Sequence, residues 1–247
     1  MGMQLHRLWR SLRRPAREVV RGVVDLVLPP VCPACGEPAA DLCAACAARL
    51  GRRPARGCRR CGEAVLVDGA LCRRDHRELQ NVQQLVAPWQ YAGAGGALVR
   101  RFKLDANVAA GRLLARAMAD AWCASAAFGW GRATLVPVPL HRTRRRARGF
   151  DQAAWLASRI GSRLRLHVAP RVLERTRATL PQGDPRTRSR DRNVEDAFVV
   201  RRPQDVRGRR VVLVDDVFTS GATVRRCSQL LLAAGARAVA ALTACRS

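Results

Sequence analysis

Residues 211–223 have the sequence VVLVDDVFTSGAT. The apolar run before Asp215 and Asp216 predicts a buried strand, and the small polar residues after them predict a loop that opens a helix. Ligands of parallel sheets bind beyond the carboxyl ends of the strands, where a helix N-terminus offers backbone N–H groups to a phosphate. Carboxylates at that point can accept hydrogen bonds from vicinal hydroxyls or help to hold Mg2+. The stretch therefore predicts a sugar-phosphate site.

The segments around this stretch alternate between strand and helix patterns. Strands are expected at 134–139, 197–200, 211–217 and 237–245, and helices at 93–125, 149–164 and 222–236. Because the strand cores are almost continuously apolar, we expect a parallel sheet with helices on both faces, which is an α/β fold over a main domain at 85–247. Residues 171–192 carry seven arginines among Pro, Gly, Thr and Ser, which predicts a mobile loop outside the core.

The composition narrows the class of protein. The chain has 247 residues, 48% of them hydrophobic, so it can bury one sizeable core and a smaller module. No run of 18 uncharged apolar residues occurs and no apolar signal segment follows Met1, so we expect a cytoplasmic protein without a transmembrane helix. The formal net charge of +26 attracts phosphate-rich partners. Lys103 is the only lysine among 45 basic residues, so the arginine excess resembles a codon bias as much as a selected surface.

An amphipathic helix is expected at 16–28, where valines and leucines recur at helical spacing before two prolines. We expect this helix, within a basic segment at 1–30, to pack on the main core. Several arginines lie close to it in the sequence, so peripheral association with a membrane surface is the alternative.

Seven of the ten cysteines lie between positions 32 and 72, which marks a module at 31–78. They form a repeat, in which CPACGE followed by LCAAC is echoed by CRRCGE followed by LCRRDH. Paired thiols followed by a glycine fit the tight turn of a zinc site, and four protein ligands would close a structural site. We expect one or two zinc ions, held by Cys32, Cys35, Cys43, Cys46, Cys58, Cys61, Cys72 and His76.

Several alternatives stay open for this module. The position that corresponds to Cys46 is Asp75, so either Asp75 or His76 could complete the second site. The ligands could also be paired across the two units. Iron–sulfur ligation is the main rival to zinc, whereas disulfides are disfavoured in a cytosolic chain. The three remaining cysteines occur in apolar patterns and are expected to be buried thiols: Cys123, Cys227 and Cys245.

A second anion site is predicted at 137–152, which have the sequence PVPLHRTRRRARGFDQ. Five arginines within eight residues follow a strand, with no acid among them. Arginine forks match phosphate oxygens, so pyrophosphate or a nucleic-acid backbone would fit this segment. A solvated basic loop is the alternative, and we expect the next helix to begin at Gly149.

These segments occur in the order that is typical of the ComF family, which includes bacterial competence proteins. The matching stretches are the cysteine ribbon, PVPLHRTRRRARGFDQ, TLPQGDPRTRSRDRNVEDAF (179–198) and VDDVFTSGAT. The last one resembles the ribose-phosphate motif of type I phosphoribosyltransferases, which bind phosphoribosyl pyrophosphate (PRPP). The resemblance implies a type I phosphoribosyltransferase-like parallel sheet flanked by helices, behind an N-terminal double zinc ribbon.

The resemblance also implies roles for individual residues. Asp215 and Asp216 match the catalytic acids that bind ribose, with Mg2+ accompanying PRPP. The positions that match phosphate or PRPP contacts are Thr219, Ser220, Gly221, Ala222, Thr223, Arg142, Arg144, Arg148, Gln182 and Arg190, with Asn193 beside the last two in a mobile-loop motif. Two residues depart from the family pattern: Asp151 stands where Asn is common, and Asp75 disrupts the last paired cysteine motif.

Two functions are expected from these features. The first is a phosphoribosyltransferase-like protein that binds PRPP or a related sugar phosphate and acts in DNA uptake during natural competence, or in nucleic-acid handling. The alternative is a non-catalytic adaptor that binds single-stranded DNA and a competence helicase, with the pocket as a sensor or scaffold. Only 4% of the residues are aromatic, so DNA contact should run through phosphates and depend steeply on salt. No Walker motif occurs, which argues against a P-loop ATPase.

Overall fold

The computed structural model describes residues 30–52, 57–58, 60–67, 70–73, 76–125, 130–177 and 197–247. Several predictions lie outside these residues, namely those for the helix at 16–28, Asp75, Gln182, Arg190 and Asn193. Among the residues described, no helix combines the length and the apolar character needed to cross a membrane.

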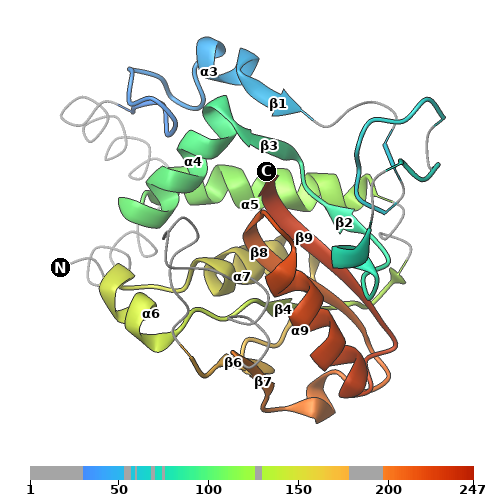
Figure 1. Ribbon diagram of the computed structural model, residues 1–247. Helices are drawn as coiled ribbons and strands as arrows, with labels where there is room; N and C mark the ends of the chain where they lie inside the picture. Colours follow the sequence, from blue (N-terminus) through green and yellow to red (C-terminus); the bar gives the residue numbers. More distant parts are fainter. Residues whose placement is uncertain are drawn as a thin grey trace, which may run out of the picture.

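A mostly parallel sheet forms the centre of the protein (Figure 1). Its strands lie in the order β1, β3, β9, β8, β4, β5, and β2 also pairs with β9. All of these pairings are parallel except that of β1 with β3. The strands are β1 (Leu50–Arg52), β2 (Leu85–Val86), β3 (Trp89–Ala92), β4 (Thr134–Pro137), β5 (His167–Val168), β8 (Arg210–Phe218) and β9 (Ala238–Arg246). The expected parallel α/β sheet is confirmed.

Helices cover both faces of this sheet. One face packs against α4 (Gly93–Leu104), α5 (Val108–Cys123) and α7 (Gln152–Leu164), and the other against α9 (Ala222–Ala233). Successive residues of β8 serve the two cores in turn, because Val212 belongs to the core under α4, α5 and α7, whereas Val211 belongs to the core under α9. This two-sided burial explains why the strand has a continuous apolar sequence. The shorter helices are α3 (Ala44–Ala48), α6 (Arg142–Arg148), η1 (Arg77–Leu79) and η3 (Pro203–Asp205).

The register of the sheet exposes the carboxyl end of β8 on one side. The pairing of β4 with β8 ends at Pro137 and Val214, whereas β9 continues beside β8 as far as Phe218. Asp215 and Asp216 are therefore the first residues of β8 beyond the end of β4. Such a position, past the end of a neighbouring parallel strand, is where α/β proteins place their ligand sites.

The arginine segment is a helix, which differs from the basic loop that was one expectation. Gly149 has a φ of 77° and ends α6 as its left-handed C-cap. Asp151 then begins α7, because its Oδ1 accepts the N–H of Ala154 at 3.0 Å. The expected helix start at Gly149 is therefore wrong, since this glycine closes the preceding helix and α7 begins at Gln152.

A small antiparallel hairpin lies outside the main sheet. It pairs β6 (Leu173–Arg175) with β7 (Phe198–Val200), and it packs in the core under α9. The strand expected at 197–200 is thus present, but it does not join the parallel sheet. The expected loop at 171–192 is wrong for its first residues, because Val172 and Leu173 are buried. Arginines dominate the composition of this segment, so the sequence pattern does not indicate that two of its apolar residues are buried.

The three cysteines outside the ribbon differ in exposure. Cys227 and Cys245 are completely buried, as expected. Cys123 is exposed, contrary to expectation, because it is the last residue of α5 and lies beyond the apolar stripe of that helix.

Candidate functional site

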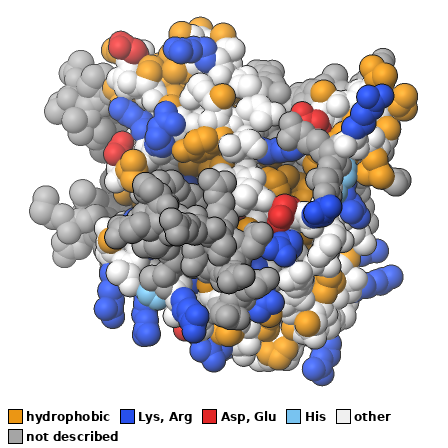
Figure 2. Space-filling view, in the orientation of Figure 1, with side chains coloured by type: hydrophobic (Ala, Val, Ile, Leu, Met, Phe, Trp, Pro, Cys, Tyr) orange, Lys and Arg blue, Asp and Glu red, His pale blue; other side chains and the backbone are white. Residues whose placement is uncertain are grey.

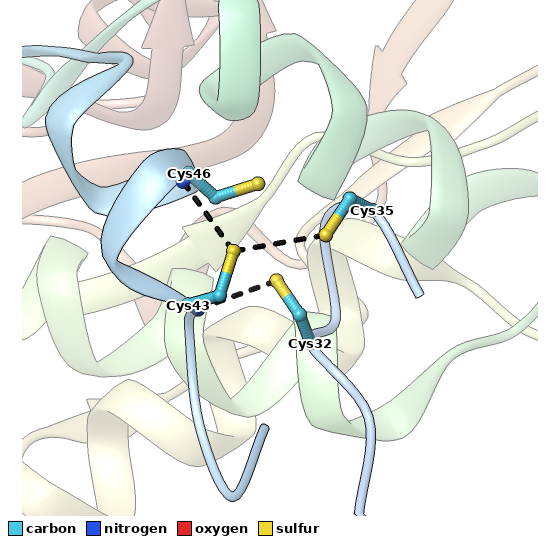
Figure 3. A group of neighbouring side chains, drawn as sticks. All are labelled: Cys32, Cys35, Cys43 and Cys46. Carbon is cyan, nitrogen blue, oxygen red and sulfur yellow. Dashed lines mark hydrogen bonds between the residues drawn. The ribbon is translucent and has the colours of Figure 1, made fainter. Parts of the chain in front are cut away.

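The expected metal ligands form two separate clusters. Cys32, Cys35, Cys43 and Cys46 make up the first, and Cys58, Cys61, Cys72 and His76 make up the second. Within each cluster the ligand atoms all lie within 4.8 Å of one another. Figure 3 shows the four thiols of the first cluster gathered around a common centre. The clusters follow the order of the chain, which contradicts the alternative of pairing across the two units.

The same turn builds both clusters. The N–H of Gly36 donates to the carbonyl of Cys32 at 2.9 Å, and that of Gly62 donates to the carbonyl of Cys58 at 2.7 Å. The two glycines have φ angles of 91° and 73°, a region that residues with a side chain rarely adopt. The repeat in the sequence is therefore a repeat of local structure.

The donor distances fit zinc. The two sulfurs of Cys35 and Cys43 are 3.7 Å apart, and those of Cys61 and Cys72 are 3.6 Å apart. Nε2 of His76 is 3.4 Å from the sulfur of Cys72. Tetrahedral zinc with Zn–S bonds of about 2.3 Å places its sulfur ligands roughly 3.8 Å apart. Four thiolates in one cluster, and three thiolates with one imidazole in the other, are donor sets of closed structural zinc sites.

Backbone donors prepare one thiol of each cluster for a metal. Burial raises the pKa of Cys32 and Cys58, but backbone N–H donors outweigh burial and lower both pKa values to about 6. Burial and the neighbouring thiols raise the pKa of Cys46 to about 12 and that of Cys61 to about 11. Because zinc binds thiolates, it must displace the protons of Cys46 and Cys61. Zinc affinity should therefore fall as the pH falls.

The acidic pair lies at the carboxyl end of β8, where alternate side chains point to opposite faces of the sheet. Asp216 points toward α4, and its Oδ1 is 2.9 Å from Nζ of Lys103. Oδ1 of Asp215 accepts the backbone N–H of Asp216 at 2.8 Å. The two carboxyl groups therefore have different partners, although they are adjacent in the chain.

The environment of Asp215 favours its protonated form. Burial raises the pKa of Asp215 to about 8, and the neighbouring charge of Asp216 acts in the same direction, against the smaller opposing effect of Lys103. The side chain keeps some exposure to the pocket described below. A protonated carboxyl group can donate a hydrogen bond as well as accept one. A shift of this kind in a pocket is typical of functional sites.

One pocket joins the acidic pair to the loop that follows it. Its lining includes both carboxyl groups, the loop and basic side chains from two other segments: Asp215, Asp216, Thr219, Ser220, Gly221, Thr223, Lys103, Arg144 and Arg148. The expected phosphate loop and acids are thus brought together, except for Ala222, which begins α9 and is not among the lining residues. The arrangement combines hydroxyl donors, a helix N-terminus and cations, which together suit a phosphorylated sugar.

The loop is packed tightly against the second ribbon unit. Gly221 has a φ of 80°, and a side chain there would come within 2.6 Å of Cβ of Glu78. The Glu78 carboxylate accepts from Nε of Arg225 in α9 at 3.0 Å. Glu78 lies two residues after the ligand His76, so the second cluster is linked to the start of α9 through this ion pair.

The arginines of α6 are divided between two pockets. Arg144 and Arg148 line the pocket of the acidic pair, whereas Arg142 and Arg145 line a neighbouring one. The family resemblance places Arg142 among the PRPP or phosphate contacts, but the structure does not bring it to the pocket of the acidic pair. Side chains of a seven-residue helix point in several directions, so consecutive arginines cannot all face a single ligand.

Three residues of the site were missed by sequence reasoning. Lys103 comes from a distant helix, and its one signal is that no other lysine occurs. Gln152 is 1% exposed and lines a small pocket together with Asp215 and Arg175. Local sequence gives no signal for Gln152 or Arg175, because their place beside the acidic pair depends on the packing of α7 and β6.

We expect two zinc ions per chain in the wild type, and one after His76→Ala and challenge with a chelator. The imidazole closes the second cluster, so its loss leaves three thiolates and an open position. Metal content measured by plasma mass spectrometry checks this. The matched control is Asp75→Ala, which should keep both ions. If Asp75→Ala loses an ion while His76→Ala keeps two, the ligand set is wrong.

The raised pKa of Asp215 predicts a stability that depends on pH. An unfolded aspartate ionises near its ordinary pKa of 3.8, whereas Asp215 in the fold ionises at about 8. The wild type therefore loses free energy of unfolding as the pH rises from about 4 to about 8, and Asp215→Asn does not. The Tm advantage of Asp215→Asn should grow across this range and stay constant above it. Thermal melts from about pH 5 to about pH 9 test this, with exposed Asp105→Asn as the control; a difference that is independent of pH would contradict it.

Comparisons with known proteins agree with a cysteine-rich ribbon that is followed by a parallel α/β domain. Residues 23–74 match the double zinc ribbon domain, and residues 147–247 match the phosphoribosyl transferase domain. The DNA utilization protein YhgH of Escherichia coli K12 is 32% identical over 228 residues, which cover 90% of this chain and 99% of that protein. Competence protein F of Haemophilus influenzae is 26% identical over 193 residues, 77% of this chain and 83% of that protein.

Among solved structures, TT1426 from Thermus thermophilus matches with a TM-score of 0.34 and 15% identity, covering 54% of this chain and 83% of that one. The order of the ribbon, the arginine helix and the acidic strand, together with similarity to YhgH along nearly its whole length, shows that the chain belongs to the ComF family.

Proposed function

We propose that the chain binds PRPP with Mg2+ in the pocket at the carboxyl end of β8, and that it acts in DNA uptake or nucleic-acid handling. The observation that carries this proposal is the meeting of Asp215 and Asp216 with the loop Thr219–Thr223 in one pocket. The carboxyl groups would hold the ribose hydroxyls, and the loop with the N-terminus of α9 would hold the 5-phosphate. The names of the relatives, DNA utilization protein and competence protein, support the role in DNA metabolism.

The residues of the pocket suit transfer of a phosphoribosyl group. An acceptor would displace pyrophosphate at the anomeric carbon, through a transition state with oxocarbenium character. Asp215 and Asp216 would orient the ribose, and Arg144 and Arg148 would stabilise the negative charge on the leaving pyrophosphate. Carboxylate oxygens are suitable ligands for Mg2+, which would supply further neutralisation of the pyrophosphate charge.

We further propose a division of the chain into a basic segment at 1–30, a ribbon at 31–78 and the transferase-like domain at 85–247. Gln182 and Arg190 are proposed as additional PRPP contacts, from the stretch outside the described residues. Arg142 stays a proposed contact for an anion in the neighbouring pocket, where Arg145 and Arg175 accompany it.

We expect saturable binding when PRPP and Mg2+ are titrated calorimetrically into zinc-loaded protein. The double variant Asp215→Asn/Asp216→Asn should bind at least about tenfold more weakly, because it loses both carboxyl groups that would pair with the ribose hydroxyls. The control is Asp105→Asn, an exposed acid outside the pocket. If folded wild type binds no PRPP, the proposal is wrong. Where PRPP binds, release of pyrophosphate that depends on an added nucleobase separates an enzyme from a sensor.

The outer side of α6 favours a second candidate function, the binding of single-stranded DNA. This helix buries none of its residues, and Arg142, Arg145 and Arg146 are all exposed. Figure 2 shows Lys and Arg side chains at the lower left of the molecule, where α6 lies in Figure 1. Exposed guanidinium groups contact phosphates without regard to base sequence. We propose this surface as the DNA contact of the adaptor function.

We expect the triple variant Arg142→Ala/Arg145→Ala/Arg146→Ala to bind single-stranded DNA more weakly and with less dependence on salt. Loss of three phosphate contacts should reduce the slope of log affinity against log salt by about 2. Fluorescence anisotropy over a salt series from about 50 to about 200 mM measures the slope. The matched control is Arg100→Ala/Arg112→Ala/Arg116→Ala, which removes three exposed arginines of α4 and α5. An unchanged slope would exclude α6 as the DNA surface.

A further inference from the structure

The chain's single lysine lies in the pocket of the acidic pair. Lys103 belongs to the last turn of α4, and its Nζ is 2.9 Å from Oδ1 of Asp216. The two side chains are 23% and 12% exposed, so the ion pair is largely withdrawn from solvent. The other 44 basic residues are arginines. We therefore ask what a lysine does at this position that an arginine would not.

Each carboxyl group of the acidic pair has one oxygen committed to a protein donor. Oδ1 of Asp216 contacts the Lys103 ammonium, and Oδ1 of Asp215 accepts the N–H of Asp216 at 2.8 Å. Within the described part of the chain, these contacts leave Oδ2 of both groups without a hydrogen bond from a protein donor. The pocket therefore offers two carboxyl oxygens, one from each of two adjacent residues.

Lysine suits this arrangement better than arginine would. An ammonium is a compact charge that can contact one carboxylate oxygen and leave the other available. A guanidinium forms a planar fork that engages both oxygens of a carboxylate in parallel. An arginine at position 103 would therefore tend to occupy both oxygens of Asp216.

We propose that Lys103 is the specificity-determining residue of this pocket, and that it selects a ribose phosphate over a 2-deoxyribose phosphate; the inference rests on the proposed sugar-phosphate function. By holding Oδ1 of Asp216, Lys103 leaves one oxygen on each acid, which matches the vicinal 2- and 3-hydroxyls of ribose. A 2-deoxyribose phosphate leaves one of these oxygens without a partner. A site built around a hydroxyl discriminates strongly against the analogue that lacks it.

Lys103 acts through Asp216, so it is a positioning residue and its signature is a ratio of affinities. The probes are ribose 5-phosphate and 2-deoxyribose 5-phosphate, titrated calorimetrically into zinc-loaded protein. We expect the wild type to prefer ribose 5-phosphate by roughly tenfold to hundredfold. Lys103→Met and Lys103→Arg should both reduce the preference to below about threefold. Arg100→Met, which removes an exposed charge from the same helix, should preserve it.

The outcomes separate this inference from the function on which it rests. If wild type binds both sugars equally, or if the preference survives in Lys103→Met and Lys103→Arg, the inference is overturned while the sugar-phosphate pocket stands. If the folded wild type binds neither sugar phosphate nor PRPP, both are overturned.

Reductive methylation adds a measurement that needs no substituted protein. Lys103 carries the only side-chain amine, so a single peptide in a mass spectrum reports its reactivity. Bound ribose 5-phosphate should protect Lys103 several-fold at saturation, because a ligand held by Asp216 would lie next to the ion pair in the same pocket. Equal labelling with and without bound ribose 5-phosphate overturns the inference.

Discussion

Asp215 and Asp216 place two carboxyl groups at the end of a strand that is buried on both faces. Burial and mutual repulsion oppose the ionisation of both groups at once. The structure gives the two groups different environments. The Lys103 ammonium pairs with Asp216 on the side of α4, while Asp215 on the other side has a pKa raised to about 8. The positions of α4 and α9 at this end of β8 decide what the pocket can bind. A destabilising carboxyl pair of this kind is tolerated where a function requires it.

The ribbon helps to fix the positions of α4 and α9. On one side, the Arg101 guanidinium of α4 lies against Gly36 of the first unit, where a side chain would come within 3.2 Å of it. On the other side, Glu78 follows the second cluster, packs on Gly221 and pairs with Arg225. A zinc site is rigid without a large hydrophobic core, so each unit can hold a short segment against the transferase-like domain. The ribbon thus supports the elements that line the pocket from behind.

The features that could be predicted from the sequence are those carried by short, continuous segments. The acids, the loop after them and the paired cysteines each lie within a few residues of one another, and local spacing fixes their geometry. Lys103, Gln152 and Arg175 reach the acidic pair from three different elements, and no local pattern records such contacts. The start of α7 was misplaced because a glycine can begin or end a helix, and tertiary packing decides which.

The short helix α6 connects the two candidate activities. Arg144 and Arg148 line the pocket, whereas Arg142, Arg145 and Arg146 face away from it or line the neighbouring pocket. A helix of seven residues is too short to be stable in isolation, so its order depends on contacts with its surroundings. The two ligands proposed above, a sugar phosphate in the pocket and DNA on the outer side, would both contact this one helix. Where one of these ligands stabilises α6, the other would bind more tightly by the same factor, because coupling between two sites is reciprocal.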